Sequence, residues 1–132
     1  MAESAAREWW RDLDPGRRAR LRRAHDAVAA APYAIELYRR WGGDLGRVAV
    51  VAAVLAGVKA DGGHPATVAM SDGRFERILR ARTDDELLRA VRSLVRLAGG
   101  AVSVSALAWA MRRWDRDDVR LDWVMRRANQ EV

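Results

Sequence analysis

The sequence predicts an all-α protein, a helical bundle of about eight helices in two small lobes. Apolar side chains recur at the i, i+3, i+4 and i+7 spacing of helices. Capping residues, prolines and glycine pairs separate these segments. No segment shows the sustained alternation of a strand, although residues 101–105 alternate briefly. The 132 residues suit one domain or two small lobes, which we expect to be residues 1–62 and 63–132.

The first two helices are predicted from their start signals. Ser4 is the candidate N-cap of a helix over residues 4–13. Asp14 before Pro15 places a capping acid before a proline at the first helical position, so a second helix should follow to about residue 30. Its expected apolar stripe comprises Leu21, Ala24 and Val28.

The next two helices complete the N-terminal lobe. One covers residues 32–41, beginning with a proline and ending before two glycines. Asp44 should cap the other, over residues 45–60, which is apolar on every side and therefore expected at the centre of the lobe. The loop at residues 61–65 then separates the two lobes.

The second half carries equally clear helix signals. Residues 66–71 fit either a loop or one helical turn, and Thr83 with Glu86 forms a capping box. Four helices are expected, over residues 73–82, 84–98, 103–114, and from a cap at Asp117 to about residue 129. Phe75, Ile78 and Leu79 should share one face of the first of these. The second should bury Leu87, Leu88, Val91, Leu94, Val95 and Ala98.

The composition argues against an enzyme or a cofactor-binding protein. There is no cysteine, which excludes disulfides, thiolate metal sites and a cysteine nucleophile. The two histidines are His25, which we interpret as lying at a helix margin, and His64 in the loop. Two such residues do not make a metal site, which needs three or four ligands. Phosphate-cradle patterns are absent, so we expect no small-molecule substrate.

The balance of charge points to a polyanionic partner. The net charge is +6, and 23 of the 24 cationic residues are arginines, with Lys59 the one lysine. Arginine binds phosphate through a planar fork of donors, and a high isoelectric point, here near 11.0, is typical of nucleic-acid binders. The longest apolar run, residues 48–58, is too short to span a bilayer. With no signal-peptide pattern in the first ten residues, we expect a cytoplasmic protein without membrane contact.

Several arginines are candidate contacts to nucleic-acid phosphates. Arg89, Arg92 and Arg96 follow i, i+3, i+7 spacing opposite the leucines of their helix, with no acidic residue after Glu86 to neutralise them. The candidates are Arg18, Arg22, Arg23, Arg89, Arg92, Arg96, Arg112 and Arg113. A solvated polar face is the plainer interpretation of any one such helix.

The six tryptophans are expected mainly as core or interface anchors. Trp109 lies on the opposite side of its helix from Leu107 and Met111, so we expect it to pack against the last helix or another subunit rather than stack on bases. Trp109 and Trp123 are the candidate subunit-interface residues.

The order of several motifs resembles one known family. The matching segments are Trp9-Trp10, the arginine-rich run at residues 16–24, Pro32 with Leu37-Tyr38, Val54-Leu55-Ala56, Arg74 to Leu79, Leu87 to Arg92, and Trp114 with Trp123. Together they resemble the CasB small subunit of Cascade, the type I-E CRISPR surveillance complex.

This resemblance implies a non-catalytic role in antiviral defence. Members of the family are all-helical and two-lobed, and they pair as dimers within the complex. The implied partners are the other Cascade subunits, a second copy of the chain, the crRNA, and the target and non-target DNA strands. The implied task is to stabilise the R-loop, since contacts to backbone phosphates can tip a nearly balanced exchange of duplexes.

Two other functions compete with this one. A helix-turn-helix regulator would carry Asn, Gln and Arg at the start of a recognition helix, but the only Asn and Gln here are Asn129 and Gln130. A helical scaffold or adaptor without direct nucleic-acid binding would use its arginines only for solubility.

Overall fold

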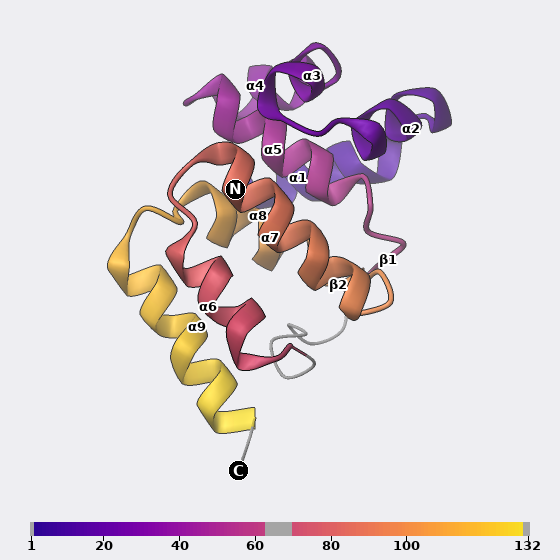
Figure 1. Ribbon diagram of the computed structural model, residues 1–132. Helices are drawn as coiled ribbons and strands as arrows, with labels where there is room; N and C mark the ends of the chain where they lie inside the picture. Colours follow the sequence, from indigo (N-terminus) through magenta and orange to yellow (C-terminus); the bar gives the residue numbers. More distant parts are fainter. Residues whose placement is uncertain (1, 63–69, 131–132) are drawn as a thin grey trace.

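The chain folds into helices, with one pair of very short strands. The computed structural model describes residues 2–62 and 70–130, and Figure 1 shows their arrangement. The elements are α1 (Ala2–Asp12), α2 (Pro15–Arg23), α3 (Ala27–Ala30), the 3-10 turn η1 (Ala31–Tyr33), α4 (Ile35–Trp41), α5 (Leu45–Leu55), β1 (Ala60–Asp61), α6 (Asp72–Arg80), α7 (Asp84–Leu97), β2 (Ala101–Val102), α8 (Val104–Arg112) and α9 (Asp117–Gln130). The prediction of an all-α helical bundle is confirmed.

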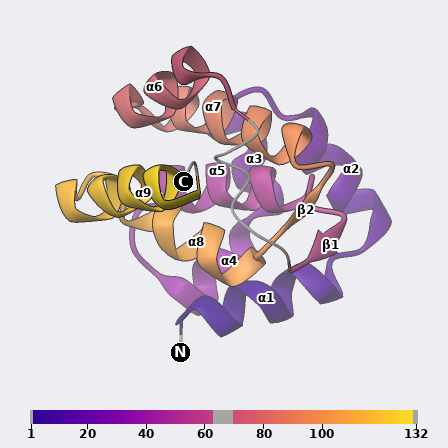
Figure 2. The same cartoon turned by 90° about the horizontal axis from the view of Figure 1, so that it is seen from below.

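Helix α5 lies at the centre of this bundle. The Asp44 side chain caps it by accepting a hydrogen bond from the Arg47 amide at 2.9 Å, as predicted. All residues from Val48 to Leu55 are buried. In Figure 2, α6 and α7 lie on one side of α5, and α1 and α8 lie on the other. The neighbours α2, α3, α4, α7 and α8 all contact α5, so its apolar circumference is covered.

The first two predicted helices differ from those observed. Because α1 begins at Ala2, Ser4 lies inside its first turn and is not its cap. The second helix stops at Arg23, since the backbone at Ala24 is extended, and a separate helix, α3, follows. The Asp26 side chain caps α3 by accepting from the Ala29 amide at 2.8 Å.

This break also corrects the predicted apolar stripe of the second helix. Leu21 and Ala24 are buried as expected, but Val28 is 83% exposed. Uninterrupted 3.6-residue periodicity would have kept the three side chains on one face. The extended residue between the helices turns α3, so that Ala30 and not Val28 enters the core.

The next two helices are shorter than predicted. Pro32 lies in η1, and α4 begins only at Ile35. Helix α5 ends at Leu55, and the chain then turns toward the segment after α7. The Lys59 amide donates to the Gly100 carbonyl at 2.8 Å, and β1 pairs with β2 in parallel. The short alternation at residues 101–105 thus includes a two-residue strand.

In the second half the predicted helices are confirmed to within about two residues. Ser71 caps α6, Ser103 caps α8, and Thr83 with Glu86 forms the capping box of α7. The predicted stripe of α7 is buried except for Ala98, which is half-buried. Asp117 is the first residue of α9 rather than a residue preceding it. Of residues 66–71, only those from Met70 on are described.

Packing joins the two halves of the sequence. One hydrophobic cluster contains buried residues from both sides of residue 62, and α1 packs on α8 as α5 does on α7. The expected division into two lobes stays a prediction. Of the described helices, none combines the length and hydropathy that crossing a bilayer requires.

The capping box of α7 gives a direct test of local stability. Thr83→Ala removes the oxygen that accepts from the Glu86 amide at 3.1 Å. We expect it to lower the free energy of unfolding by about 1 kcal/mol, because a helix-terminal amide then loses its partner. Thr83→Ser keeps that oxygen and should cost less than about 0.5 kcal/mol. Urea denaturation measures both, and equal losses would contradict the capping role.

Candidate nucleic-acid interface

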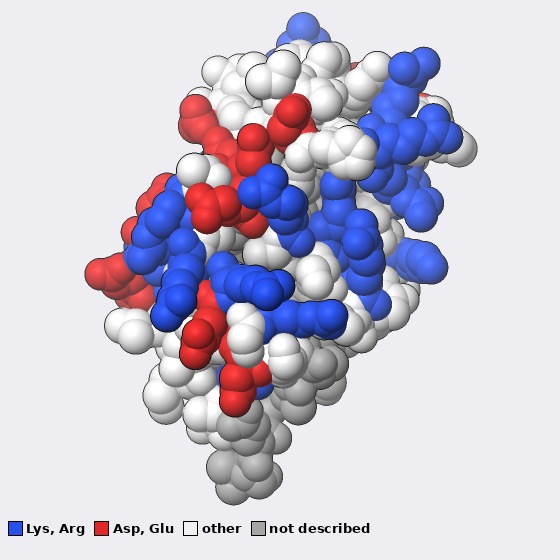
Figure 3. Space-filling view, viewed as in Figure 1, with Lys and Arg blue, Asp and Glu red and all other residues white. Residues whose placement is uncertain are grey.

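Cationic side chains gather on one face of the molecule. On the right of Figure 3, over α2 and the C-terminal part of α7, they form a patch, whereas cations and carboxylates are mixed on the left. Two adjoining hollows of about 290 and 470 Å³ lie in this region and share Arg22, Gly57 and Lys59. We call their cationic lining the basic groove, which comprises Arg11, Arg18, Arg22, Lys59, Arg92 and Arg96.

The buried faces of α2 and α7 determine where these arginines point. Helix α7 buries its leucine and valine stripe against the core, which leaves the opposite face for its arginines. Helix α2 buries only Leu21, so its other side chains stay near the surface. Lys59 comes from the turn after α5. Its side chain crosses Gly100, where a Cβ would lie 2.9 Å from the Lys59 Cγ, and the positive φ of 83° at Gly100 also favours glycine.

Two of the predicted contact residues bind backbone carbonyls of the protein itself. Arg92 donates to the Ala24 carbonyl at 2.7 Å and to the Leu21 carbonyl at 3.1 Å, at the end of α2. Arg18 donates to the Trp10 carbonyl at 3.0 Å and lies over the Trp10 ring, 5.6 Å from its centroid. Both guanidinium groups line the groove while holding helix ends together.

Burial and a neighbouring positive charge lower the pKa of both Arg18 and Arg92. Burial lowers the pKa of Arg92, and the neighbouring charge of Arg96 lowers it further. Burial likewise lowers the pKa of Arg18, with a second contribution from Arg22. Cations that lie this close together without carboxylates repel one another, and a bound polyanion relieves that repulsion.

Four of the other predicted residues are exposed. These are Arg22, Arg23, Arg89 and Arg96, and no carboxylate among residues 2–62 and 70–130 forms an ion pair with any of them. Arg22 and Arg96 line the basic groove. Arg89 lies on α7 beside a separate hollow that faces α6.

The structure does not bring Arg112 and Arg113 into the basic groove. Arg112 is half-buried, with its guanidinium 4.4 Å from the centroid of the Trp41 ring. Arg113 lies 4.7 Å from the centroid of the Trp109 ring and donates to the Trp109 carbonyl at 3.2 Å. Cation–π packing thus engages both side chains within the fold, and their contact to nucleic acid stays a prediction.

The two candidate interface tryptophans have different surroundings. Trp109 is 39% exposed and borders a hollow whose other side is formed by α9 residues, including Val119 and Asp122. Trp123 is 8% exposed and packs edge-on against Trp114, with ring centroids 4.8 Å apart. Within a single chain, therefore, only Trp109 offers a large surface, and a subunit contact by either residue stays a prediction.

Sequence reasoning missed several cations that line the hollows. Arg11 and Lys59 join the groove only because α1 and the turn after α5 meet there, and no local pattern signals that meeting. Arg74 and Arg77, which line the hollow between α6 and α7, do have a signal. They are three residues apart, which places them next to each other on one face of α6.

The candidate metal ligands in the described parts of the chain do not gather into a site. His25 is exposed and lies in the segment between α2 and α3, not on the margin of the predicted second helix, and its neighbour Asp26 caps α3. Across residues 2–62 and 70–130, no three His, Cys, Asp or Glu side chains come together as metal ligands. His64 lies outside the described residues.

Fold and surface together define a small all-helical protein with an arginine-rich face. Residues 17–126 match the family model of CRISPR-associated protein Cse2, and the chain belongs to that family. Cse2 is the CasB small subunit of type I-E Cascade, so the resemblance found in the sequence is confirmed. The match includes every cation of the basic groove except Arg11. No curated protein and no solved structure matches the chain.

The structural role of Arg92 predicts a difference between neighbouring arginines of α7. Arg92→Ala leaves the carbonyls of Leu21 and Ala24 without their charged donor, and we expect the free energy of unfolding to fall by about 2 kcal/mol. Arg89→Ala, on the same helix but exposed, should change it by less than about 0.5 kcal/mol. Chemical denaturation of the two variants makes the comparison, and similar values would refute this role for Arg92.

Proposed function

We propose that this chain is a non-catalytic subunit of Cascade whose basic groove binds the nucleic-acid backbone and stabilises the R-loop. The observation that supports this most strongly is the lining of the groove. Six cations surround two adjoining hollows, and no carboxylate in the described parts of the chain forms an ion pair with any of them. Such a surface attracts a polyanion through its phosphates, which are the same for every base sequence.

The arginines of the groove have two different roles, and both suit the binding of a nucleic-acid backbone. Arg18 and Arg92 are held by the carbonyls of helix ends, so they form a rigid base for the groove. Arg22 and Arg96 are exposed beside them and can reach phosphates directly. When a guide RNA displaces one DNA strand, an RNA–DNA duplex replaces a DNA duplex of nearly equal stability. A few additional contacts to phosphates can therefore shift the equilibrium toward the R-loop.

The proposed partners follow from family membership and from this surface. They are other Cascade subunits, a second copy of the chain, the crRNA, and both strands of the target DNA. We assign Trp109 to a contact with another protein chain, because it is more exposed than Trp123, the other tryptophan that the sequence predicts at an interface. A scaffold that does not touch nucleic acid is the alternative, and the exposed Leu121 and Met125 on α9 are the feature that favours it.

Charge reversal in the groove tests the proposal. We expect Arg22→Glu/Arg96→Glu to weaken binding of a single-stranded oligonucleotide at least about tenfold, because two phosphate contacts become repulsive. Arg39→Glu/Arg40→Glu is the matched control, since it changes the net charge equally on α4, outside the groove. Fluorescence anisotropy at fixed salt measures both. Equal losses would show that only net charge matters, and no loss in either variant would favour the scaffold.

The salt dependence of binding gives a second measure of the same contacts. If six cations neutralise phosphates of a single strand, the logarithm of the affinity should fall with the logarithm of salt concentration at a slope of about −4. The Arg22→Glu/Arg96→Glu variant should have a slope of about −3, and the α4 control should keep the original value. A slope near zero for the wild-type protein would exclude binding through phosphates.

A further inference from the structure

A second cationic hollow lies on the other side of α7, between α6 and α7. Its volume is about 480 Å³, which is in the range of small-molecule binding sites. We call it the α6–α7 hollow. Its lining residues are Met70, Arg74, Arg77, Arg80, Glu86, Arg89, Ala90 and Ser93. None of them lines the basic groove, so the ridge of α7 separates two cationic depressions.

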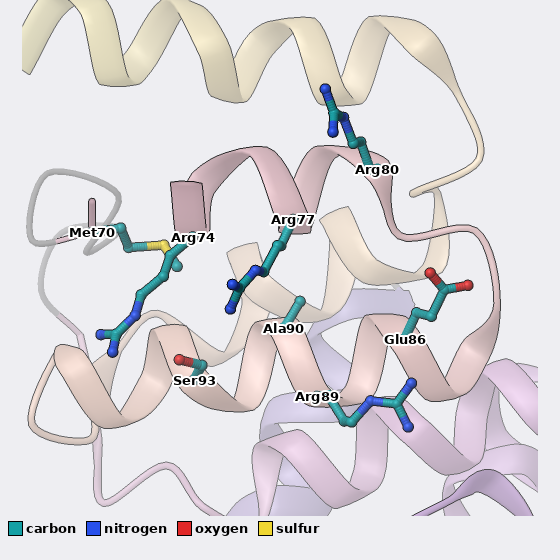
Figure 4. A pocket seen from close by; sticks show the side chains of 8 residues that line it. All are labelled: Met70, Arg74, Arg77, Arg80, Glu86, Arg89, Ala90 and Ser93. Atoms are coloured by element: carbon teal, nitrogen blue, oxygen red, sulfur yellow. The ribbon is translucent and has the colours of Figure 1, made fainter. Parts of the chain in front are cut away.

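Two arginines make one end of this hollow strongly positive. Figure 4 shows Arg74 and Arg77 extending from α6 toward the part of α7 that carries Ala90 and Ser93. Both are exposed, and no carboxylate among the described residues forms an ion pair with either. Arg80 does not add to this positive end, because it points away from α7 in Figure 4 and forms an ion pair with Glu76, with 3.8 Å between Arg80 Nη2 and Glu76 Oε2.

The one carboxylate of the hollow does not neutralise these arginines. Glu86 belongs to the capping box of α7, where its Oε1 accepts from the Thr83 hydroxyl at 3.0 Å and from the Thr83 amide at 3.3 Å. In Figure 4 it lies at the far end of the hollow from Arg74. An anion beside Arg74 and Arg77 therefore meets two guanidinium forks and little competing negative charge.

The rest of the lining is not suited to an anion alone. Met70 and Ala90 contribute apolar atoms to the lining, although Met70 is only 4% exposed and Ala90 is half-buried. Ser93 adds a hydroxyl that can donate or accept a hydrogen bond. A ligand that combines a phosphate with a polar group and an apolar surface satisfies all of these groups, and a nucleotide is one such ligand.

We propose that the α6–α7 hollow binds one nucleotide unit of a single nucleic-acid strand, an inference that rests on the proposed function. Arg74 and Arg77 hold the phosphate, Ser93 hydrogen-bonds the sugar or base edge, and the base lies against Met70 and Ala90. A duplex keeps its bases stacked inside and offers only its backbone to such a surface. A single strand can place a whole unit in the hollow, so the site selects single strands over duplex.

Small probes separate recognition of a nucleotide from simple attraction of anions. Thymidine 5′-monophosphate, thymidine, inorganic phosphate and a hexaglutamate peptide are each titrated into the isotope-labelled protein. We expect the nucleotide to shift the amide resonances of α6 and α7 with an affinity at least about fivefold above that of phosphate or thymidine. Phosphate or hexaglutamate binding as tightly as the nucleotide, or no shift at α6 and α7, would overturn the proposal.

Two variants test the same site in a longer strand. Arg74→Glu/Arg77→Glu should weaken binding of oligothymidine at least about fivefold and of a duplex less than about twofold. Ala90→Leu fills the hollow without changing charge, and leucine is a good helix former. It should abolish the preference for nucleotide over phosphate while leaving phosphate binding intact. Far-ultraviolet circular dichroism and thermal melting verify that each variant is folded.

The outcomes also separate this site from the basic groove. If Arg22→Glu/Arg96→Glu weakens oligonucleotide binding while Arg74→Glu/Arg77→Glu behaves like the α4 control, the hollow is not a binding site and the proposed function stands. If the wild-type protein binds no oligonucleotide, both fail. Both proposals are supported if both double variants bind the oligonucleotide more weakly and if Arg74→Glu/Arg77→Glu weakens binding of a single strand more than binding of a duplex.

Discussion

The burial of α5 on every side is the constraint on which the rest of the structure depends. A helix without a polar face leaves water only when neighbours surround it. Arg47, at the start of α5, fixes two of those neighbours: its Nε donates to Asp84 at 2.7 Å and its Nη1 to the Met111 carbonyl at 3.0 Å. Burial opposes the charge of Arg47, but the hydrogen bond to Asp84 and the charges of Asp115 and Asp84 outweigh it and raise its pKa. The same constraint fixes α2 and α7, whose outer faces carry the cations.

Arginine serves two purposes in this fold, and the two are adjacent. At the ends of helices it adds a charged donor to backbone carbonyls, as Arg92 does for Leu21 and Ala24 around the end of α2. On the surface it supplies charge, as Arg22 and Arg96 do. Because structural and exposed arginines line the same hollow, the position of the basic groove is tied to the packing of α2 against α7.

Local signals in the sequence predict the helices well, and contacts between distant segments explain where those signals fail. The caps at Asp44, Ser71, Thr83 and Ser103 act within four residues, so spacing alone reveals them. At the break after Arg23, the Ala24 carbonyl accepts from the Arg92 guanidinium of α7, which lies 68 positions further along the sequence. The candidate site likewise has a part that local sequence patterns predict and a part that depends on contacts between distant segments. Periodicity places Arg89, Arg92 and Arg96 on one face of α7, but only packing decides that Arg92 meets α2.

The near absence of lysine from the cationic surface has a consequence for regulation. The basic groove and the α6–α7 hollow together contain a single primary amine, that of Lys59. Guanidinium groups keep their protons throughout the pH range in which proteins stay folded, whereas acetylation cancels charge only at amines. Neither acidity nor acetyl transfer can thus switch off more than a small part of this surface, which behaves as a permanent rather than an adjustable source of charge.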